Sequence, residues 1–176
     1  MIKEYKISNK NGISIVILLY GGIIKEINVP DRKGNFENIV LSYNNNSEYI
    51  KDQFFIGALI GRHANRISNG KFELNNQEIS LDLNEGNNHI HGGFEGFNKK
   101  LWKLVEHKTI KKKFIKISHF SKHLDSGYPG NLNCIVKYSL NDLNEFTIEF
   151  FAKSDIDTIF NPTSHSYFNL NPSIKT

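Results

Sequence analysis

The chain has 176 residues, enough for one domain with a sizeable core, since a chain of this length buries roughly 70% of its surface. Its formal charge of +4 comes from scattered lysines rather than from one basic arm, which argues against nucleic acid as a partner. Cys134 is the single cysteine, residues 1–20 lack a signal-peptide pattern, and no apolar run approaches the ~18 residues of a membrane span, so we expect one cytoplasmic domain over residues 1–176 without a membrane partner.

Apolar residues recur with a period of two along most of the chain, which is typical of strands. In chain order, the first strands are predicted at residues 13–20, 23–29 and 38–42, separated by Gly21-Gly22 and by a loop. Residues 44–52 are predicted as a loop that leads into a short helical turn.

The remainder of the chain continues as hairpins. Residues 71–82 predict a hairpin that turns at Asn75-Asn76, because asparagine tolerates the positive φ that a two-residue turn requires. Strands are expected at 102–107 and 114–120, and a further pair, 131–140 and 145–154, is predicted to meet across a turn at Asn141-Asp142. No segment shows helical apolar spacing over three turns, so periodicity predicts an all-β fold, either a sandwich or a barrel.

The stretch NNHIHGGFEGF, residues 87–97, places two histidines one residue apart. In a strand, His89 and His91 would point to the same face, as a chelating His-x-His pair does, and Glu95 follows at a spacing that cupin-type metal sites use. The glycines of the cupin pattern are absent, however, and short motif matches have a high false-positive risk. The alternative is that the Gly-Gly pair forms a turn and His89 is solvated. We expect no bound metal.

Arg62 and Arg66 lie together in GRHANRIS, although the chain has only three arginines and otherwise prefers lysine. The planar guanidinium offers a fork of donors that suits binding several oxygens at once. The alternative is that both arginines form structural ion pairs.

His165 lies in NPTSHSYFNL, among small hydroxyls, aromatic rings and an amide. Because its ordinary pKa is near 6.5, a histidine here can exchange protons at neutral pH and act as a general acid. The alternative is a structural histidine whose hydrogen bonds are satisfied within the fold.

Four segments, in this order, resemble the aldose 1-epimerases, the galactose mutarotase family. Each motif is weak alone, but their order and spacing are specific, and they extend over about residues 13–170. The segments are Gly61-Arg62-x-Ala64-Asn65-Arg66-Ile67, then Asn88-x-Ile90-His91-Gly92-Gly93 followed by Gly96-Phe97 and Trp102, then SGYPGNL at 126–132, and SHSYFNL at 164–170.

This resemblance implies an antiparallel β-sandwich of the galactose mutarotase-like type, present here as an incomplete, N-terminal part. Such proteins bind a hexose in an open groove without a metal or other cofactor, and they interconvert the α and β anomers of galactose or glucose. A histidine acid protonates the ring oxygen while a carboxylate base takes the proton from the C1 hydroxyl. The ring opens, the C1–C2 bond rotates, and closure gives the other anomer.

Carried over position by position, His165 matches the acid, and His91 matches the second active-site histidine, which hydrogen-bonds the sugar near its ring oxygen. Asn65 and Arg66 match the substrate-binding Asn-Arg pair, and Tyr167 lies beside the acid in the substrate-binding segment. The resemblance thus implies catalytic roles for the two histidines and substrate-binding roles for the other three residues.

The chain departs from the family pattern at two points. Ser164 stands where the family usually has Asn before the acid, and a serine can still orient the histidine by hydrogen bonding. The carboxylate base of the family lies beyond the position that matches Thr176, and no carboxylate side chain follows His165 here. We therefore expect mutarotation to be absent or feeble in this chain alone, and we expect a C-terminal half or another copy of the chain to cover exposed sheet edges.

Two other functions remain open. One is a non-catalytic carbohydrate-binding or regulatory module that keeps the sugar groove without turnover. The other is a hexose-6-phosphate 1-epimerase, which the GRxANR and SGYPG motifs fit less well than they fit the enzymes of free sugars.

Overall fold

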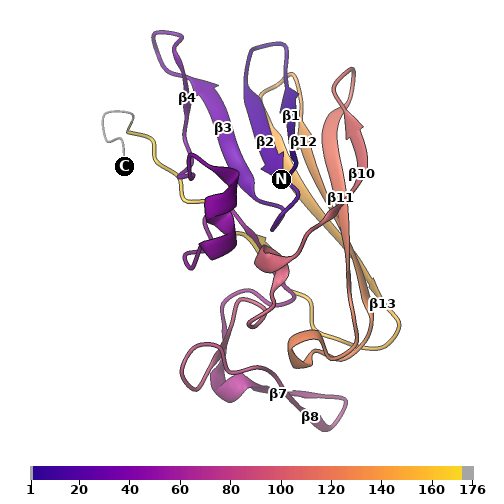
Figure 1. The fold of residues 1–176 in the computed structure, drawn as a ribbon. Helices are drawn as coiled ribbons and strands as arrows, with labels where there is room; N and C mark the ends of the chain where they lie inside the picture. The colour runs from indigo at the N-terminus through magenta and orange to yellow at the C-terminus, as the bar shows by residue number, and fades with distance from the viewer. Residues whose placement is uncertain (1, 172–176) are drawn as a thin grey trace.

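Two four-stranded antiparallel sheets form the body of the protein (Figure 1), as seen in a computed structural model that describes residues 2–171. Both sheets keep their strands in sequence order. The first contains β1 (Glu4–Ser8), β2 (Ser14–Leu18), β3 (Ile24–Pro30) and β4 (Phe36–Asn38). The second contains β10 (Lys103–Lys108), β11 (Lys113–Ser121), β12 (Leu132–Leu140) and β13 (Phe146–Ser154).

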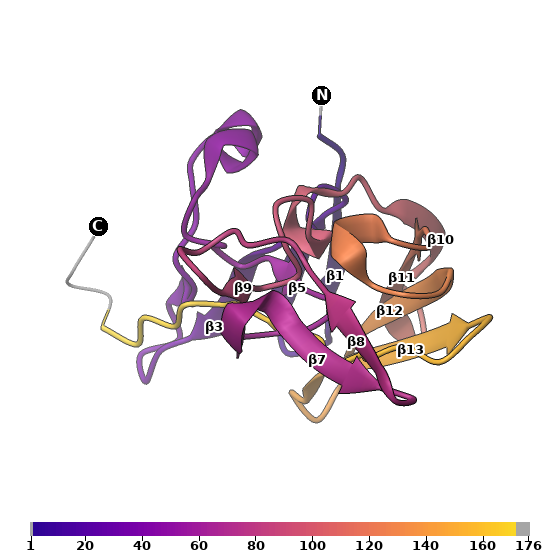
Figure 2. The same ribbon diagram turned by 90° about the horizontal axis from the view of Figure 1, so that it is seen from below.

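Among the described residues, three short strand pairs and four short 3-10 helices lie outside the two large sheets. The pairs are β5 (Leu59–Ile60) with β14 (Thr163–Ser164), β6 (Arg66–Ile67) with β9 (His89–Ile90), and β7 (Lys71–Leu74) with β8 (Gln77–Ser80). The helices are η1 (Asn46–Lys51), η2 (Ser68–Gly70), η3 (Phe97–Lys99) and η4 (Asp125–Gly127). Figure 2 looks onto the end of the molecule where β5, β9 and the β7–β8 hairpin lie.

The main core lies between the two large sheets. Ile15 and Ile17 of β2 belong to the same buried cluster as Ile115 of β11 and Val136 and Tyr138 of β12. Each such side chain contributes roughly 1.5–3 kcal/mol through burial. The core therefore confirms the predicted all-β sandwich.

Local turn chemistry follows the sequence closely. Asn75 and Asn76 have φ values of 53° and 60° and join β7 to β8, which confirms the predicted two-residue turn. The expected helical turn within 44–52 is η1. The turn after β12 runs from Asn141 to Glu145, whose backbones are joined by an N–H to carbonyl bond of 3.1 Å.

The strand predicted at 38–42 is wrong in its bounds, because pairing with β3 ends at Asn38. The Asn38 side chain accepts hydrogen bonds from the backbone N–H groups of Ile27 and Val40, which replaces the regular ladder. Beyond it, the Leu41 N–H donates to the Tyr167 carbonyl at 2.9 Å. The Ile39 N–H still donates to the Ile27 carbonyl of β3 at 3.0 Å, so this part of the chain joins β3 to the segment that follows β14.

Candidate functional site

His91 is fixed by a reciprocal pair of hydrogen bonds with Asn65, which the β6–β9 pairing brings beside it. The His91 N–H donates to the Asn65 carbonyl at 3.2 Å, and the Asn65 N–H donates to His91 Nδ1 at 3.0 Å. Both residues have positive φ, 54° and 65°. Because Nδ1 accepts a hydrogen bond, the neutral ring carries its proton on Nε2, which is then a hydrogen-bond donor.

The environment of His91 favours this neutral form. Burial, followed by the nearby charges of His165 and Arg66, lowers the pKa of His91 from 6.5 to about 4, and Glu85 opposes the shift. Desolvation disfavours the imidazolium, and neighbouring positive charges repel it. At neutral pH, His91 therefore donates a hydrogen bond from Nε2 and has no net charge.

His165 lies next to His91 although the two are far apart in the sequence. Its backbone is held by the two residues just before β5: the His165 N–H donates to the Ala58 carbonyl at 2.8 Å, and its carbonyl accepts from the Gly57 N–H at 3.2 Å. The two imidazole rings have their centroids 5.3 Å apart at an interplanar angle of 84°. The structure thus brings together the two histidines that the sequence singled out.

Phe55 packs against both histidines and is a residue that sequence reasoning missed. Its ring centroid lies 4.8 Å from that of His91 and 5.8 Å from that of His165. Tyr167, as expected, lies beside the acid position, with its ring 5.0 Å from His165 and its hydroxyl donating to the Phe54 carbonyl at 2.9 Å. Only the adjacent pair of phenylalanines in a loop marked this segment in the sequence, and that pattern is not specific.

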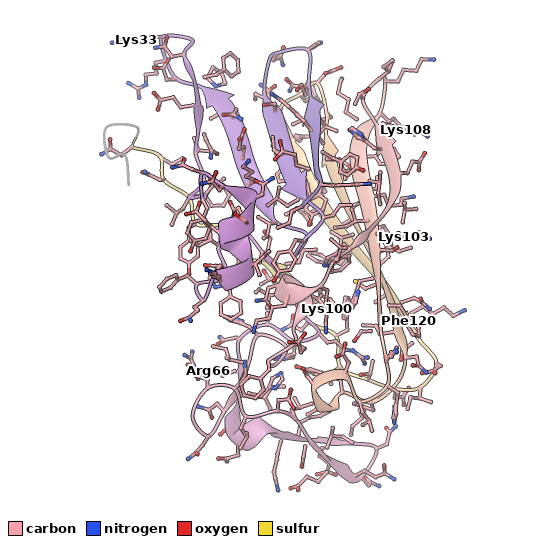
Figure 3. All side chains as sticks on the ribbon, viewed as in Figure 1. Lys33, Arg66, Lys100, Lys103, Lys108 and Phe120 are labelled. Carbon is pink, nitrogen blue, oxygen red and sulfur yellow. The ribbon has the colours of Figure 1, made fainter. Side chains whose placement is uncertain are left out.

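Arg66 forms a two-pronged ion pair with Glu85, the second residue that the sequence did not reveal. Its Nε donates to Glu85 Oε2 at 2.7 Å, and its Nη2 donates to Oε1. This pairing raises the pKa of Arg66 and lowers that of Glu85. Figure 3 shows Arg66 toward the same end of the molecule as the β7–β8 hairpin.

Arg62, in contrast, is a buried structural residue with 2% of its surface exposed. Its guanidinium donates to several oxygens at once, but these belong to backbone carbonyls and hydroxyl groups of the protein. The alternative prediction of an ion pair is therefore wrong for Arg62, whereas Arg66 does form one, with Glu85. Burial lowers the pKa of its guanidinium. The acceptors are the carbonyls of Ser121, Lys122, Pro129 and Gly130 and the hydroxyls of Ser121 and Thr158.

His89 and His91 do not face the same side, so that expectation is wrong. β9 ends at Ile90, and the positive φ of His91 turns the chain away from strand geometry. His89 is fully buried rather than solvated, with Nδ1 2.8 Å from the Asp82 carbonyl and Nε2 2.6 Å from the Tyr128 hydroxyl. Within residues 2–171, no group of three or more His, Cys, Asp or Glu side chains is placed to hold a metal ion.

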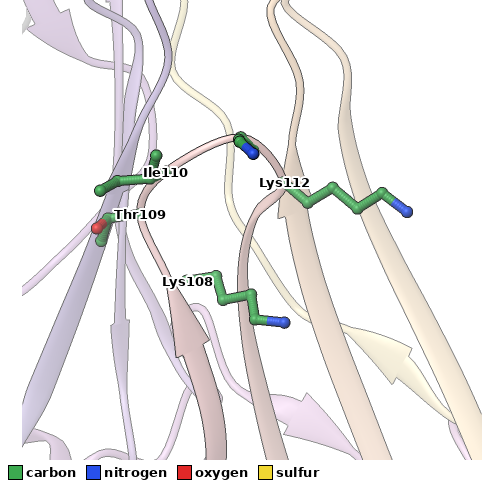
Figure 4. A pocket seen from close by; sticks show the side chains of 5 residues that line it. Lys108, Thr109, Ile110 and Lys112 are labelled. Atoms are coloured by element: carbon green, nitrogen blue, oxygen red, sulfur yellow. The ribbon is translucent and has the colours of Figure 1, made fainter.

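A pocket at the tip of the β10–β11 hairpin lies away from this site. Residues 108–112 line it (Figure 4), and Figure 3 places Lys108 and Arg66 toward opposite ends of the molecule. The lysines of this segment lie where β10 ends and β11 begins. The pocket shares no residue with the His91–His165 pair, so we do not assign it to the same function.

Comparison with known proteins decides the family, since the aldose 1-epimerase family model matches residues 3–176. The chain belongs to the aldose 1-epimerase family. Within this family it is 32% identical over 169 residues to the maltose epimerase of Levilactobacillus brevis, a match that covers 96% of this chain and 49% of the relative. It is 36% identical over 158 residues to the galactose mutarotase of Bos taurus, covering 90% of this chain and 45% of the relative.

The fold is that of the aldose 1-epimerase family as well. A solved aldose epimerase homologue from C. elegans superimposes with a TM-score of 0.92 at 30% sequence identity, covering 97% of this chain and 52% of that structure. The expected galactose mutarotase-like sandwich is therefore confirmed. The chain spans about half the length of the relatives that it matches. Within residues 2–171 of the present chain, no helix combines the length and the hydrophobicity of a membrane span.

Proposed function

We propose that this chain supplies the histidine side of a mutarotase site, in a protein that interconverts the α and β anomers of a hexose such as galactose or glucose. The observation that carries the proposal is the pairing of His91 with His165. One ring is held neutral with a donor at Nε2, and the other stands 5.3 Å away. Membership of the aldose 1-epimerase family supports the same reaction class.

In the proposed mechanism, His165 gives its proton to the ring oxygen as the bond between that oxygen and C1 breaks. His91 donates a hydrogen bond from Nε2 near the same oxygen, which stabilises the position of the sugar through the reaction. A carboxylate takes the proton of the C1 hydroxyl, so that C1 becomes an aldehyde. After rotation about C1–C2, the same steps in reverse close the ring, and both proton transfers occur without a cofactor.

Asn65, Arg66 and Tyr167 are proposed to hold the sugar. Asn65 is fixed to His91 through its backbone, and Arg66 follows it directly on β6. Tyr167 lies beside His165. Asn65 and Tyr167 thus each contact one histidine of the pair, and Arg66 adjoins Asn65, which supports a role in binding hydroxyl groups on the same sugar ring.

We propose that the carboxylate base lies outside these 176 residues. Glu85 is the carboxylate whose charge acts most on His91, and it is engaged by Arg66. The relatives that the chain matches are about twice as long, so their sequences contain further candidates. The removal of a positioned base typically lowers a rate about 10²–10⁴-fold.

Polarimetry on freshly dissolved α-galactose and α-glucose tests the proposal. We expect absent or feeble mutarotation from this chain alone and recovery when a C-terminal segment of the family is supplied. In the recovered enzyme, His165→Gln should abolish the acceleration, while His107→Gln, a change on β10, should not. Full activity of the isolated chain would refute the external base, and full activity of His165→Gln would refute the acid.

A carbohydrate-binding module without turnover is the second candidate, and the engagement of Glu85 by Arg66 favours it. In that function, the same residues would bind hexose and perform no chemistry. Calorimetric titration with galactose and glucose distinguishes the two. Saturable binding without mutarotation, even after a C-terminal segment is supplied, would support the binding module over the enzyme.

The free edge of β13 is the proposed contact for a further part of the sandwich. Among the described residues, β13 pairs only with β12. Phe146, Ile148 and Phe150 are half-buried against the main core, and Phe151 is 51% exposed. We propose that a C-terminal half pairs with this edge, or that another copy of this chain does so where no C-terminal half is present.

Light scattering after size exclusion tests this contact. Co-expression with a C-terminal segment should give a one-to-one complex, and β13 variants such as Ile148→Pro should prevent it. A stable monomer that does not bind the C-terminal segment would refute the contact.

We also propose a cytoplasmic location for the protein, as expected from the sequence. Cell fractionation checks it.

A further inference from the structure

The Arg66–Glu85 pair lies at the candidate sugar site and occupies most of one edge of the guanidinium. Arg66 uses both Nε and Nη2 on the same carboxylate, which is the geometry that fixes the plane of an arginine fork. The charges of both residues influence the pKa of His91, Arg66 lowering it and Glu85 raising it. The ion pair is therefore close enough to affect whatever binds beside that histidine.

Both partners are held by backbone structure rather than by chance contact. Arg66 pairs with Ile90 in the β6–β9 ladder. Glu85 and Asn88 exchange two backbone hydrogen bonds, of 3.1 and 2.9 Å, in the turn that leads into β9. The two side chains thus start from adjoining, hydrogen-bonded segments, which limits the positions that the carboxylate can take.

A guanidinium is well suited to a phosphate dianion, because it offers parallel donors and a permanent positive charge. Glu85 already accepts two of those donors and cancels the charge. A sugar phosphate would have to displace this carboxylate or approach its negative charge, whereas a neutral hexose would do neither. The remaining donors of Arg66 stay suitable for uncharged hydroxyl groups.

We propose that Glu85 is a specificity-determining residue: it orients Arg66 and neutralises it, so that the site accepts neutral hexoses and discriminates against hexose phosphates. This inference rests on the proposed function, because it names the substrate class of that same site. Glu85 acts through Arg66 and through its own charge. It has no part in the proton transfers.

The test compares the binding of galactose and galactose 6-phosphate by calorimetric titration of the 176-residue chain. Glu85→Gln should tighten the binding of galactose 6-phosphate about tenfold relative to galactose, the size expected for one unit charge within about 6 Å of a phosphate dianion in water. The change should largely vanish near 0.5 M salt, because a screened exposed charge no longer acts over that distance. Galactose itself should bind a few-fold more weakly, since Arg66 loses its fixed orientation.

Glu78→Gln is the matched control, because Glu78 forms an exposed ion pair with Lys71 at 2.7 Å across the β7–β8 hairpin. It removes the same charge from a surface pair outside the site, so the ratio of the two affinities should stay unchanged. A second readout needs no ligand. The chain has three arginines, so its Nε–H region in an NMR spectrum is simple, and the signal of Arg66 should shift in Glu85→Gln and not in the control.

The outcomes separate this inference from the function beneath it. Wild-type chain that binds neither sugar would count against the proposed function and against the role of Glu85 with it. Galactose binding with an unchanged preference in Glu85→Gln, or an unmoved Arg66 signal, would overturn the role of Glu85 alone. If Glu85→Gln binds galactose 6-phosphate more tightly and the gain persists at high salt, the role of Glu85 would also be overturned, because the effect would not be electrostatic.

Discussion

Replacing His91 with Asn should make the folded protein less sensitive to acid. The environment lowers the pKa of His91 from 6.5 to about 4, whereas the unfolded chain keeps the ordinary value. Between these values the unfolded state binds a proton that the folded state does not. The free energy of unfolding therefore falls as the pH drops from 6.5 toward 4, and it is fully retained above 6.5.

The size of the effect follows from the gap between the two pKa values. With pKa values of 6.5 and about 4, protonation of the unfolded chain removes about 2 kcal/mol of stability at pH 5. Because the ring of His91 is partly exposed, solvent screening reduces this to about 1–2 kcal/mol. Asn is the suitable replacement, since it tolerates the φ of 54° and keeps an acceptor for the Asn65 N–H.

Urea unfolding of both proteins at pH 7.5 and pH 5 measures the effect. The loss of stability between the two pH values should be smaller by about 1–2 kcal/mol in His91→Asn than in the wild type. His63, His89 and His119, whose pKa values are also lowered by burial, contribute to both proteins and cancel in the comparison. An equal pH dependence in the two proteins, or an NMR titration of His91 near 6.5, would refute the reasoning.

Three further changes test the scaffold around the site, each by urea unfolding. Tyr128→Phe leaves the buried Nε2 of His89 without its partner and should lower the free energy of unfolding by about 1–3 kcal/mol; an unchanged value would contradict the 2.6 Å bond. Arg62→Lys should lower the free energy of unfolding by about 3 kcal/mol or more, because a single ammonium cannot reach acceptors spread over several segments. An unchanged free energy of unfolding would show that the guanidinium of Arg62 is dispensable. Asn76→Ala should lower the free energy of unfolding by about 1 kcal/mol, because alanine is strained at the φ of 60°, whereas Asn76→Gly should not lower it. Equal free energies of unfolding for the two variants would contradict the argument from backbone strain.

Short-range features of this protein could be predicted because they depend on neighbouring residues. The turn at Asn75-Asn76 needs two residues that accept positive φ, and both are asparagines. Strands 132–140 and 146–154 show their period-two pattern locally. The two histidines could also be singled out, since each stands in a short motif whose order along the chain is specific.

Long-range contacts at the site could not be predicted in this way. Phe55 reaches both histidines from a loop with no distinctive pattern, and Glu85 meets Arg66 only because β6 pairs with β9. The period of two even misled the expectation for His89 and His91. A single positive φ at the second histidine separates their side chains, and only the surrounding fold imposes it.

The sequence by itself therefore determined the all-β class, the turns, and the residue types available for proton transfer and sugar binding. Tertiary structure decided which of them act together. It buried His89 against Tyr128 and Arg62 among backbone carbonyls, and it left His91 beside His165. The physical reason is that protonation state and hydrogen-bond partners depend on burial and on neighbouring charges, which arise only when distant segments pack.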